Sequence, residues 1–223
     1  MIYLRYIGVI LIRLLGKIPP KVYVACSGGP DSMAVLDFLR RSKRDIIACY
    51  FDHGTPHSKG AEDIVRDYCN DNNIPLVVGR RKKEKPAGES WEEYWRNERL
   101  AFFHSLDGPV VTGHTLDDVC EWWIFTSLTG MPRLIPRNNK NVIRPFILTK
   151  KHQLQAWCVA RGVKFVEDPS NSSDKFMRSF IRKNMMSKAL YVNPGFYKVI
   201  SKKLVNEPQH DFPIKDTRLY TGL

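Results

Sequence analysis

Residues 22–32 read VYVACSGGPDS. An apolar run of strand length ends at Ser27, two glycines follow, and MAVLDFLRR continues with helical periodicity. A strand that turns directly into a helix leaves backbone N–H groups pointing at one spot, where the helix dipole also favours negative charge. Gly28 and Gly29 allow a ligand to approach the backbone closely, and Pro30 suits a first helical turn. The stretch predicts an anion-binding loop.

This loop is not a Walker A loop, because it contains no lysine. Ser-Gly-Gly-x-Asp-Ser after a strand instead resembles the pyrophosphate loop of the N-type ATP pyrophosphatases. Those enzymes cut ATP between its α and β phosphates and use the adenylyl group to activate an oxygen. The alternative is a glycine-rich turn without a ligand. The resemblance implies that ATP binds through Ser27, Gly28, Gly29, Pro30, Asp31 and Ser32.

Composition limits the class of protein. The 223 residues, 43% of them hydrophobic, are enough for one large α/β domain or for a domain with a small appendage. The five cysteines lie far apart and form no C-x-x-C pair, which argues against a zinc or iron–sulfur site. Scattered cysteines in odd number fit a reducing compartment, so we expect a cytoplasmic protein.

The first residues, MIYLRYIGVILIRLL, are strongly apolar. Arg5 and Arg13 leave only residues 6–12 uncharged, far short of the ~20 residues of a membrane span. The following Lys17-Ile-Pro-Pro offers no small-residue cleavage site for a signal peptide. We therefore expect an amphipathic helix that packs against the domain, and no membrane attachment.

The positive charge is concentrated in one third of the chain. Net charge is +12, yet residues 1–132 contain 17 basic and 17 acidic residues. Residues 133–203 contain 16 basic residues against three acidic ones. Such a surface is expected for a protein that binds a nucleic-acid backbone, although a solvated basic face is the alternative.

Apolar strands alternate with helical patterns in the first part of the chain. This alternation predicts an α/β fold with a doubly wound, mostly parallel sheet. We expect strands at 21–26, 46–51, 75–80 and 109–112, and helices at 32–41, 61–72, 90–106 and 116–129. We divide the chain into an α/β core with the N-terminal helix (1–132), a small basic, mostly helical extension (133–205) and a loose tail (206–223).

Within the extension, the patterns predict three helices. The first covers residues 149–161, with Thr149 as N-cap and Gly162 as the stop signal. The others cover about 176–189 and 193–204. Residues 143–146 and 164–166 are expected to be extended, and 168–174 to form a turn-rich loop.

Polar residues follow two further strands, at the edge where parallel sheets bind ligands. Asp52 and His53 end the second strand, and Asp52 suits a ribose hydroxyl, a metal or a cap of the next segment. Gly113 and His114 end the fourth strand, before Asp117-Asp118. Adjacent acids opposite a phosphate loop suit Mg²⁺, although acids in a first helical turn also stabilise the helix.

Further motifs make the resemblance specific. SGGPDS, DHG, SWEEYWRNER, GHTLDDVCE, IRPF, and EDPSN followed by MRSFIR resemble the tRNA(Ile)-lysidine synthetases in order and approximate spacing. The similar region covers roughly residues 20–190. The resemblance implies the adenine nucleotide alpha-hydrolase-like fold. It also implies that ATP adenylates the C2 oxygen of the wobble cytidine of CAU-anticodon tRNA(Ile), and that the ε-amine of free L-lysine then displaces AMP.

The resemblance assigns roles residue by residue. It implies catalytic roles for Asp31, His114, Asp117, Asp118 and Arg178, of which Asp31, Asp117 and Asp118 bind Mg²⁺. It implies AMP binding at Asp52, His53 and Gly113, in addition to the loop. It implies RNA binding by Arg96, Arg133, Arg137, Arg144, Asn171, Arg182 and Lys183. Members are often dimeric, so the resemblance allows a homodimer, although the sequence identifies no interface.

The chain departs from the family pattern at several positions. Val119 and Trp122 replace the usual Gln and Thr, and Thr129 and Ser179 stand where the family has Arg and Asn. Thr55-Pro56 replaces the usual Leu-Arg. Family members usually continue with further tRNA-binding domains. We therefore expect this chain to hold RNA with its own basic third, to oligomerise, or to act on a smaller or different RNA.

Two other functions compete with lysidine synthesis. A related enzyme could move sulfur onto a tRNA base, but such relatives often rely on cysteine pairs or metal–sulfur clusters. A protein that binds ATP or RNA without chemistry is the non-enzyme alternative. The intact SGGPDS and Asp117-Asp118 motifs favour catalysis.

Overall fold

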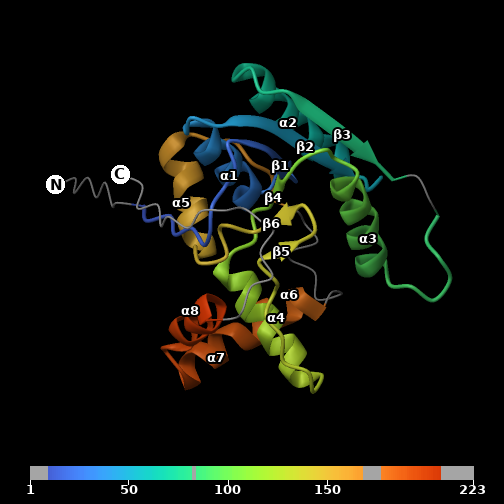
Figure 1. Cartoon of the computed structure of the whole chain (residues 1–223). Helices are drawn as coiled ribbons and strands as arrows, with labels where there is room; N and C mark the ends of the chain where they lie inside the picture. The colour runs from blue at the N-terminus through green and yellow to red at the C-terminus, as the bar shows by residue number, and fades with distance from the viewer. Residues whose placement is uncertain (1–9, 82–83, 168–176, 207–223) are drawn as a thin grey trace, which may run out of the picture.

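The computed structural model describes residues 10–81, 84–167 and 177–206. Its sheet contains six strands in the spatial order β3-β2-β1-β4-β6-β5 (Figure 1). The strands are β1 (Lys21–Cys26), β2 (Asp45–Asp52), β3 (Leu76–Arg80), β4 (Val110–Val111), β5 (Asn138–Asn139) and β6 (Val142–Ile143). All pairs are parallel except β5–β6. The doubly wound, mostly parallel α/β sheet is confirmed.

The helices fall close to their expected positions in the first part of the chain. They are α1 (Pro30–Arg40), α2 (Ser58–Asp71), α3 (Trp91–His104), α4 (Leu116–Leu128), α5 (Lys151–Arg161), α6 (Met177–Phe180), α7 (Met186–Val192) and α8 (Phe196–Asn206). The strand order reverses between β1 and β4, so the loop after β1 opens at the switch point where such sheets bind ligands.

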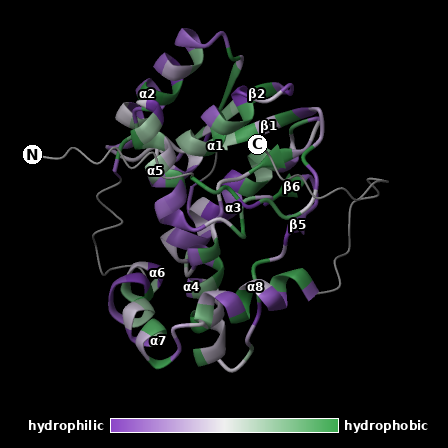
Figure 2. Ribbon diagram, turned by 90° about the vertical axis from the view of Figure 1, so that its left-hand side faces the viewer, coloured by the Kyte–Doolittle hydropathy of each residue, from purple (hydrophilic) through white to green (hydrophobic). Residues whose placement is uncertain are grey.

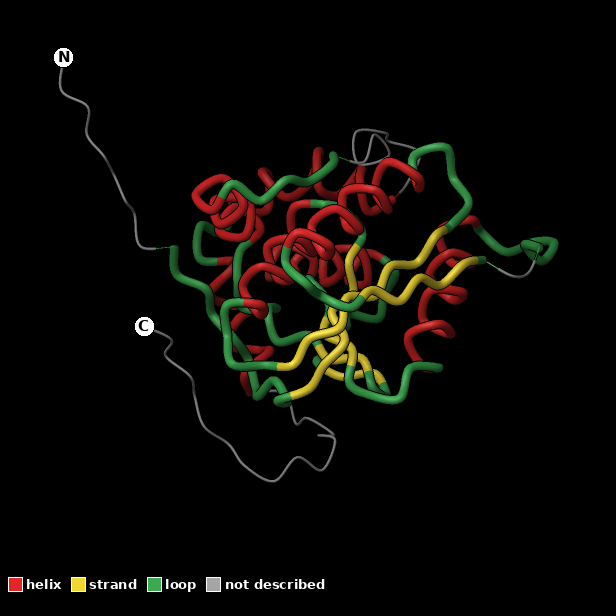
Figure 3. Tube along the Cα trace, turned by 90° about the horizontal axis from the view of Figure 1, so that it is seen from above, coloured by secondary structure: helices red, strands yellow, loops and turns green. Residues whose placement is uncertain are grey.

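Helices cover both faces of the sheet, as the view from above shows (Figure 3). Val22, Val24 and Cys26 of β1 pack with α1, α2 and α5 in the largest core cluster. Tyr23 and Ala25, which point the other way, pack with α3. The central strands are accordingly among the hydrophobic parts of the ribbon (Figure 2). Because successive β1 side chains point to opposite faces, one face of the sheet is covered by α1, α2 and α5 and the other by α3.

A separate helical cluster lies below the sheet (Figure 1). Helix α4 runs away from the sheet, and Leu116, Val119 and Cys120 on it pack with Ile200 and Leu204 of α8. This packing joins the last described helix to the helix that begins after β4. Val119, which stands where the family usually has Gln, is therefore a fully buried core residue.

The expected N-terminal helix is not formed in the part that the structure describes, residues 10–20. The backbone there bonds to a distant segment instead. Arg13 N donates to Thr149 Oγ1 at 3.0 Å, and Thr149 Oγ1 donates to Arg13 O at 2.8 Å. Leu15 N donates to Pro145 O at 2.7 Å. These contacts use the N–H and C=O groups that a helix would need. Residues 1–9, the loop expected at 168–174 and residues 207–223 of the tail lie outside the described residues.

The extension also differs in detail from expectation. Lys150, not Thr149, is the N-cap of α5, because the Thr149 hydroxyl bonds to Arg13. Gly162 ends α5 in the left-handed conformation, φ 64°, as expected. A π-helical turn, Ile181–Met185, separates α6 from α7, where the pattern predicts one continuous helix. In the described part of the chain, no helix is long and apolar enough to cross a membrane.

Candidate functional site

The loop between β1 and α1 is held in shape by its own serines. Ser32 Oγ accepts a hydrogen bond from Ser27 N and donates to Gly29 O, both at 3.0 Å. Gly28 has φ +78°, and a Cβ there would lie 3.0 Å from the Ala61 carbonyl oxygen. Gly29 is the N-cap of α1 and makes no side-chain cap, while Pro30 begins the helix. The loop is thus preformed, and the amino end of α1 carries no capping side chain.

Asp31 is the acidic group of this loop. Its Oδ2 lies 3.0 Å from Lys151 Nζ at the start of α5, and its buried Oδ1 has no hydrogen-bond partner. Burial raises the pKa of Asp31 to about 6, although Lys151 opposes the shift. A Cβ on Gly113 would lie 3.2 Å from the Asp31 backbone, so the β4 end touches the loop. An unpartnered buried carboxylate oxygen beside an anion-binding loop fits a divalent cation that also binds phosphate.

The two acids at the start of α4 have different surroundings. Asp118 Oδ2 accepts hydrogen bonds from Thr115 N and Oγ1, at 2.7 and 2.8 Å. Asp117 Oδ2 accepts from Lys151 N, and its Oδ1 accepts from the Tyr197 hydroxyl, both at 2.7 Å. Asp117 therefore ties α4 to α5 and α8. Among the described residues, no group of three or more His, Cys, Asp and Glu side chains could hold a metal.

Sequence reasoning missed the ion pair between Glu121 and Arg182. Arg182 Nε and Nη2 donate to the two Glu121 carboxylate oxygens at 2.7 and 2.9 Å. Arg182 Nη2 also lies 3.8 Å from Asp118 Oδ1. Burial raises the pKa of Glu121 despite the arginine. The spacing was a usable signal, because a residue three positions after Asp118 shares its helix face.

Positive side chains gather around His114. Burial lowers the pKa of His114, and the charge of Arg144 lowers it further, with smaller effects from Arg178 and Arg99. Burial, Arg96 and Arg99 lower the pKa of Arg144 to about 10. The buried Nε atoms of Arg144 and Arg178 have no hydrogen-bond partner. Like charges held together with unused donors have the chemistry that suits an anion.

Asp118 joins this cluster to the loop. It contributes to the raised pKa of Asp31 and to the electrostatics of His114. The structure thus brings Asp31, Gly113, His114, Asp118 and Arg182 into one neighbourhood. The His114 ring is held from the strand side, because its Nδ1 lies 2.8 Å from Thr112 Oγ1.

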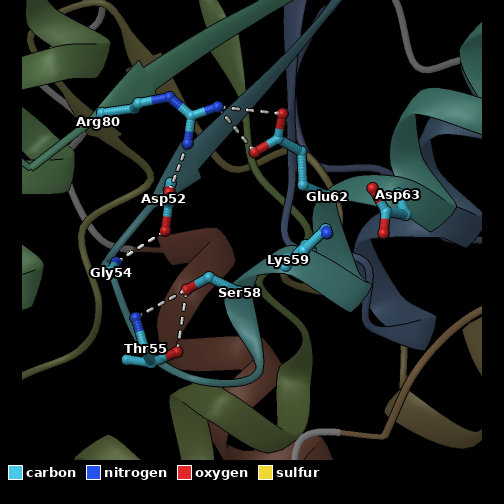
Figure 4. A pocket seen from close by; sticks show the side chains of 8 residues that line it. All are labelled: Asp52, Gly54, Thr55, Ser58, Lys59, Glu62, Asp63 and Arg80. Carbon is cyan, nitrogen blue, oxygen red and sulfur yellow. Dashed lines mark hydrogen bonds and ion pairs between the residues drawn. The ribbon is translucent and has the colours of Figure 1, made fainter.

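Asp52 and His53 lie at the adjacent strand end. Asp52 accepts a hydrogen bond from Gly54 N at 2.7 Å and pairs with Arg80 at 2.5 Å (Figure 4). It does not cap α2, whose N-cap is His57. His53 packs instead on the α3 side, with its ring 6.0 Å from that of Trp95. A cavity of about 480 Å³ opens beyond β2, lined by Asp52, Gly54, Thr55, Ser58, Lys59, Glu62, Asp63 and Arg80 (Figure 4).

Several predicted RNA-binding residues lie away from this neighbourhood or outside the described residues. Arg133 is exposed after α4. Arg137 lies against Gly16, where a Cβ would overlap its guanidinium. Lys183 is exposed on the π-helical turn, one residue after Arg182. Asn171 lies outside the described residues.

Comparison with known proteins gives the family. Residues 11–189 match the PP-loop domain family. The tRNA(Ile)-lysidine synthase of Francisella philomiragia is 26% identical over 207 residues, which cover 86% of this chain and 52% of that protein. The enzyme of the same name from Thermus thermophilus is 32% identical over 183 residues, covering 77% of this chain and 36% of that protein.

The chain therefore spans about half or less of the length of these curated relatives. Among solved structures, the U34-tRNA thiolase NcsA from Methanococcus maripaludis superposes with a TM-score of 0.68 at 16% identity, covering 88% of this chain and 75% of that one. That likeness shows a shared fold. With a glycine-containing loop at the switch point of a parallel sheet and a match over residues 11–189, this chain belongs to the PP-loop domain family.

Proposed function

We propose that this chain uses ATP to modify tRNA, adenylating the C2 oxygen of the wobble cytidine of CAU-anticodon tRNA(Ile) and replacing AMP with the ε-amine of L-lysine. The observation that carries the proposal is the preformed loop with the unpartnered Asp31 oxygen, connected through Asp118 to two charged clusters. The names of the curated relatives support the choice of substrates.

The loop would bind the phosphates of ATP. Its backbone N–H groups and the amino end of α1 favour negative charge. Asp31 is the residue most suited to Mg²⁺, and Asp118 is the second carboxylate nearby. When bound, the ion would neutralise phosphate charge and orient the pyrophosphate leaving group. The roles of Asp52, His53 and Gly113 toward AMP, and of Asp117 toward metal, remain proposals from the family pattern.

The two charged clusters suit the other reactants. Asp118 and Glu121 together attract a cationic amine, and Arg182 keeps both carboxylates in place. On the other side, Arg144 and Arg178 can donate to RNA phosphate or to the charge that develops at the adenylated base. Arg96, Arg133, Arg137, Asn171 and Lys183 complete the proposed RNA contacts.

The second step must remove protons from lysine. Its ε-ammonium loses one proton before the attack and a second after the nitrogen bonds to C2. The bond between C2 and the AMP oxygen breaks, and AMP leaves with that electron pair. Burial and the arginines lower the pKa of His114 and so make it a weak base. We therefore assign its neutral imidazole a hydrogen bond to phosphate or to the developing charge, and the protons of lysine pass to water. Transfer of sulfur through a cysteine is disfavoured, because burial raises the pKa of all five thiols, the opposite of a reactive thiolate.

A reconstituted reaction tests the proposal. Purified protein is mixed with CAU-anticodon tRNA(Ile) transcript, ATP, Mg²⁺ and labelled lysine, and both lysine incorporation and AMP release are measured. We expect both signals to disappear with Asp31→Asn and with a guanosine at the wobble position. Asp45→Asn, at an exposed position on the opposite end of β2, is the matched control.

Each departure from that outcome has a meaning. AMP release without lysine incorporation would keep the adenylating chemistry and contradict the amine or the RNA. Bound ATP with neither signal would contradict catalysis and favour the binding-protein alternative. Lysine incorporation that survives Asp31→Asn would contradict the role of the loop.

A further inference from the structure

The phosphate loop contains no cationic side chain, yet one stands directly beside it. Residues 27–32 read SGGPDS, without Lys or Arg. Lys151, the first residue of α5, is 120 positions away from Asp31 in sequence, and its Nζ lies 3.0 Å from Asp31 Oδ2. Its side chain is 27% exposed, so a ligand in the loop can reach it.

Helix α5 is fixed to the loop at several points. Cys158 Sγ donates to the carbonyl of Pro30 at 3.3 Å. Beyond the helix, Val166 N donates to the carbonyl of Gly28 at 2.9 Å. The Lys151 backbone N–H is itself held by Asp117 Oδ2 at 2.7 Å. The position of the Lys151 backbone relative to the loop is therefore set by the fold, and only its side chain needs to move.

We propose that Lys151 binds the pyrophosphate half of ATP and so supplies the lysine that the loop lacks. The inference rests on the proposed ATP reaction. In the free protein, Lys151 neutralises Asp31. When Asp31 turns to a divalent cation, the ammonium is released next to the β and γ phosphate oxygens. An ammonium has three donors on a flexible stem, which suits several phosphate oxygens at once.

The neighbouring lysine provides a matched control. Lys150 is the N-cap of α5, and its Nζ lies over the Tyr197 ring, 4.5 Å from the ring centre. Lys150→Gln and Lys151→Gln therefore remove the same charge from adjacent positions of one helix end. A general electrostatic effect would be similar in both variants, whereas direct binding would be lost in only one.

Calorimetric titration of the full chain with magnesium pyrophosphate, and separately with AMP, tests the proposal. We expect Lys151→Gln to weaken pyrophosphate binding by roughly tenfold or more, the usual value for a hydrogen bond to a charged group. AMP binding should change less than about twofold, because AMP lacks the β and γ phosphates. Lys150→Gln should leave both affinities near wild type, and Lys151→Arg should retain most of the pyrophosphate affinity.

The opposite results are equally clear. Equal pyrophosphate affinity in Lys151→Gln and Lys150→Gln would overturn the role of Lys151 and leave the proposed ATP reaction intact. Equal losses for pyrophosphate and AMP in Lys151→Gln would also overturn it. If Lys151→Gln does not fold, a Lys151→Arg variant that folds but loses pyrophosphate affinity to the same degree as AMP affinity overturns it. A wild-type chain that binds no magnesium pyrophosphate would overturn both proposals.

Discussion

Asp37 is a single buried carboxylate that joins three helices on the α1 side of the sheet. It receives hydrogen bonds from Arg40 at the end of α1 and from Arg41, the C-cap of that helix. Tyr68 of α2 and Trp157 of α5 also donate to it. Burial alone would raise its pKa, but these four donors lower it to about 2. The residue is 1% exposed, so the network is part of the core.

This network should make folding sensitive to acid. The folded pKa of Asp37 lies below the unfolded value near 3.9, so its stabilisation is present above pH 4 and is lost as pH falls toward 2. The contribution is ~2 kcal/mol. Asp37→Asn should remove this part of the pH dependence, as measured by urea unfolding between pH 2.5 and 6. Equal slopes in variant and wild type would contradict the assignment.

The Glu121–Arg182 pair should be costly to break from one side. Arg182→Met leaves a carboxylate that is 2% exposed without its bidentate partner, and we expect a loss of ~3 kcal/mol in the free energy of unfolding. Glu121→Gln keeps the shape of the side chain and leaves an arginine that is 30% exposed, so its loss should be smaller. Chemical denaturation of both single variants and the double variant measures the coupling. Additive effects would show that the two side chains do not interact.

Among the secondary-structure elements, the local hydrophobic pattern predicted the central strands correctly. It failed where a distant segment forms hydrogen bonds with the same backbone. The strand at 21–26 was predicted to the residue, because an apolar run there ends in glycines. The N-terminal segment was expected to be helical, but the Thr149 hydroxyl forms hydrogen bonds with the backbone N–H and C=O of Arg13. The π-helical turn at Ile181–Met185 has no signature in a single sequence.

For the candidate site too, residues placed by the local pattern were predictable, whereas residues placed by distant contacts were not. Strand ends of a parallel sheet meet at one edge, so Asp31, Gly113 and His114 were predictable together. Lys151 was not identified, because its partner Asp31 lies far away in sequence. Glu121 was missed although its spacing from Asp118 was a usable signal, since its partner Arg182 is also distant in sequence. The sequence allowed Asp117 either to bind Mg²⁺ or to stabilise the first turn of its helix. In this structure its carboxylate accepts hydrogen bonds from Lys151 N and from the Tyr197 hydroxyl.

Two glycines in helical elements should respond to alanine in opposite ways. Gly162 ends α5 with φ +64°, so Gly162→Ala should destabilise the chain by ~1 kcal/mol even though open space surrounds it. Gly60 lies inside α2 with open space and without a positive φ, so Gly60→Ala should stabilise by ~0.5–1 kcal/mol. Thermal unfolding of both variants measures the difference. A stabilising Gly162→Ala would contradict the capping role.

At the scale of the molecule, the charge distribution predicts where RNA lies. Lys198 and Lys202 are exposed one turn apart on α8. Replacing both with Gln should weaken tRNA binding and reduce the slope of log K against log salt by ~1.5, if each contacts one phosphate. Lys21 and Lys43 lie exposed at the opposite, amino edge of the sheet and form the control pair. Equal slopes for the two double variants would contradict an RNA surface on α8.

The burial of all five thiols gives the chain an internal reporter of its own opening. An alkylating reagent reaches a cysteine only when the surrounding structure separates, so the labelling rate of each site measures a local opening rate. Cys158 bonds to the phosphate loop through Pro30, whereas Cys69 lies in α2. A ligand that stabilises the loop should therefore slow the labelling of Cys158 more than that of Cys69, and mass spectrometry of the peptides would locate binding without any change of sequence.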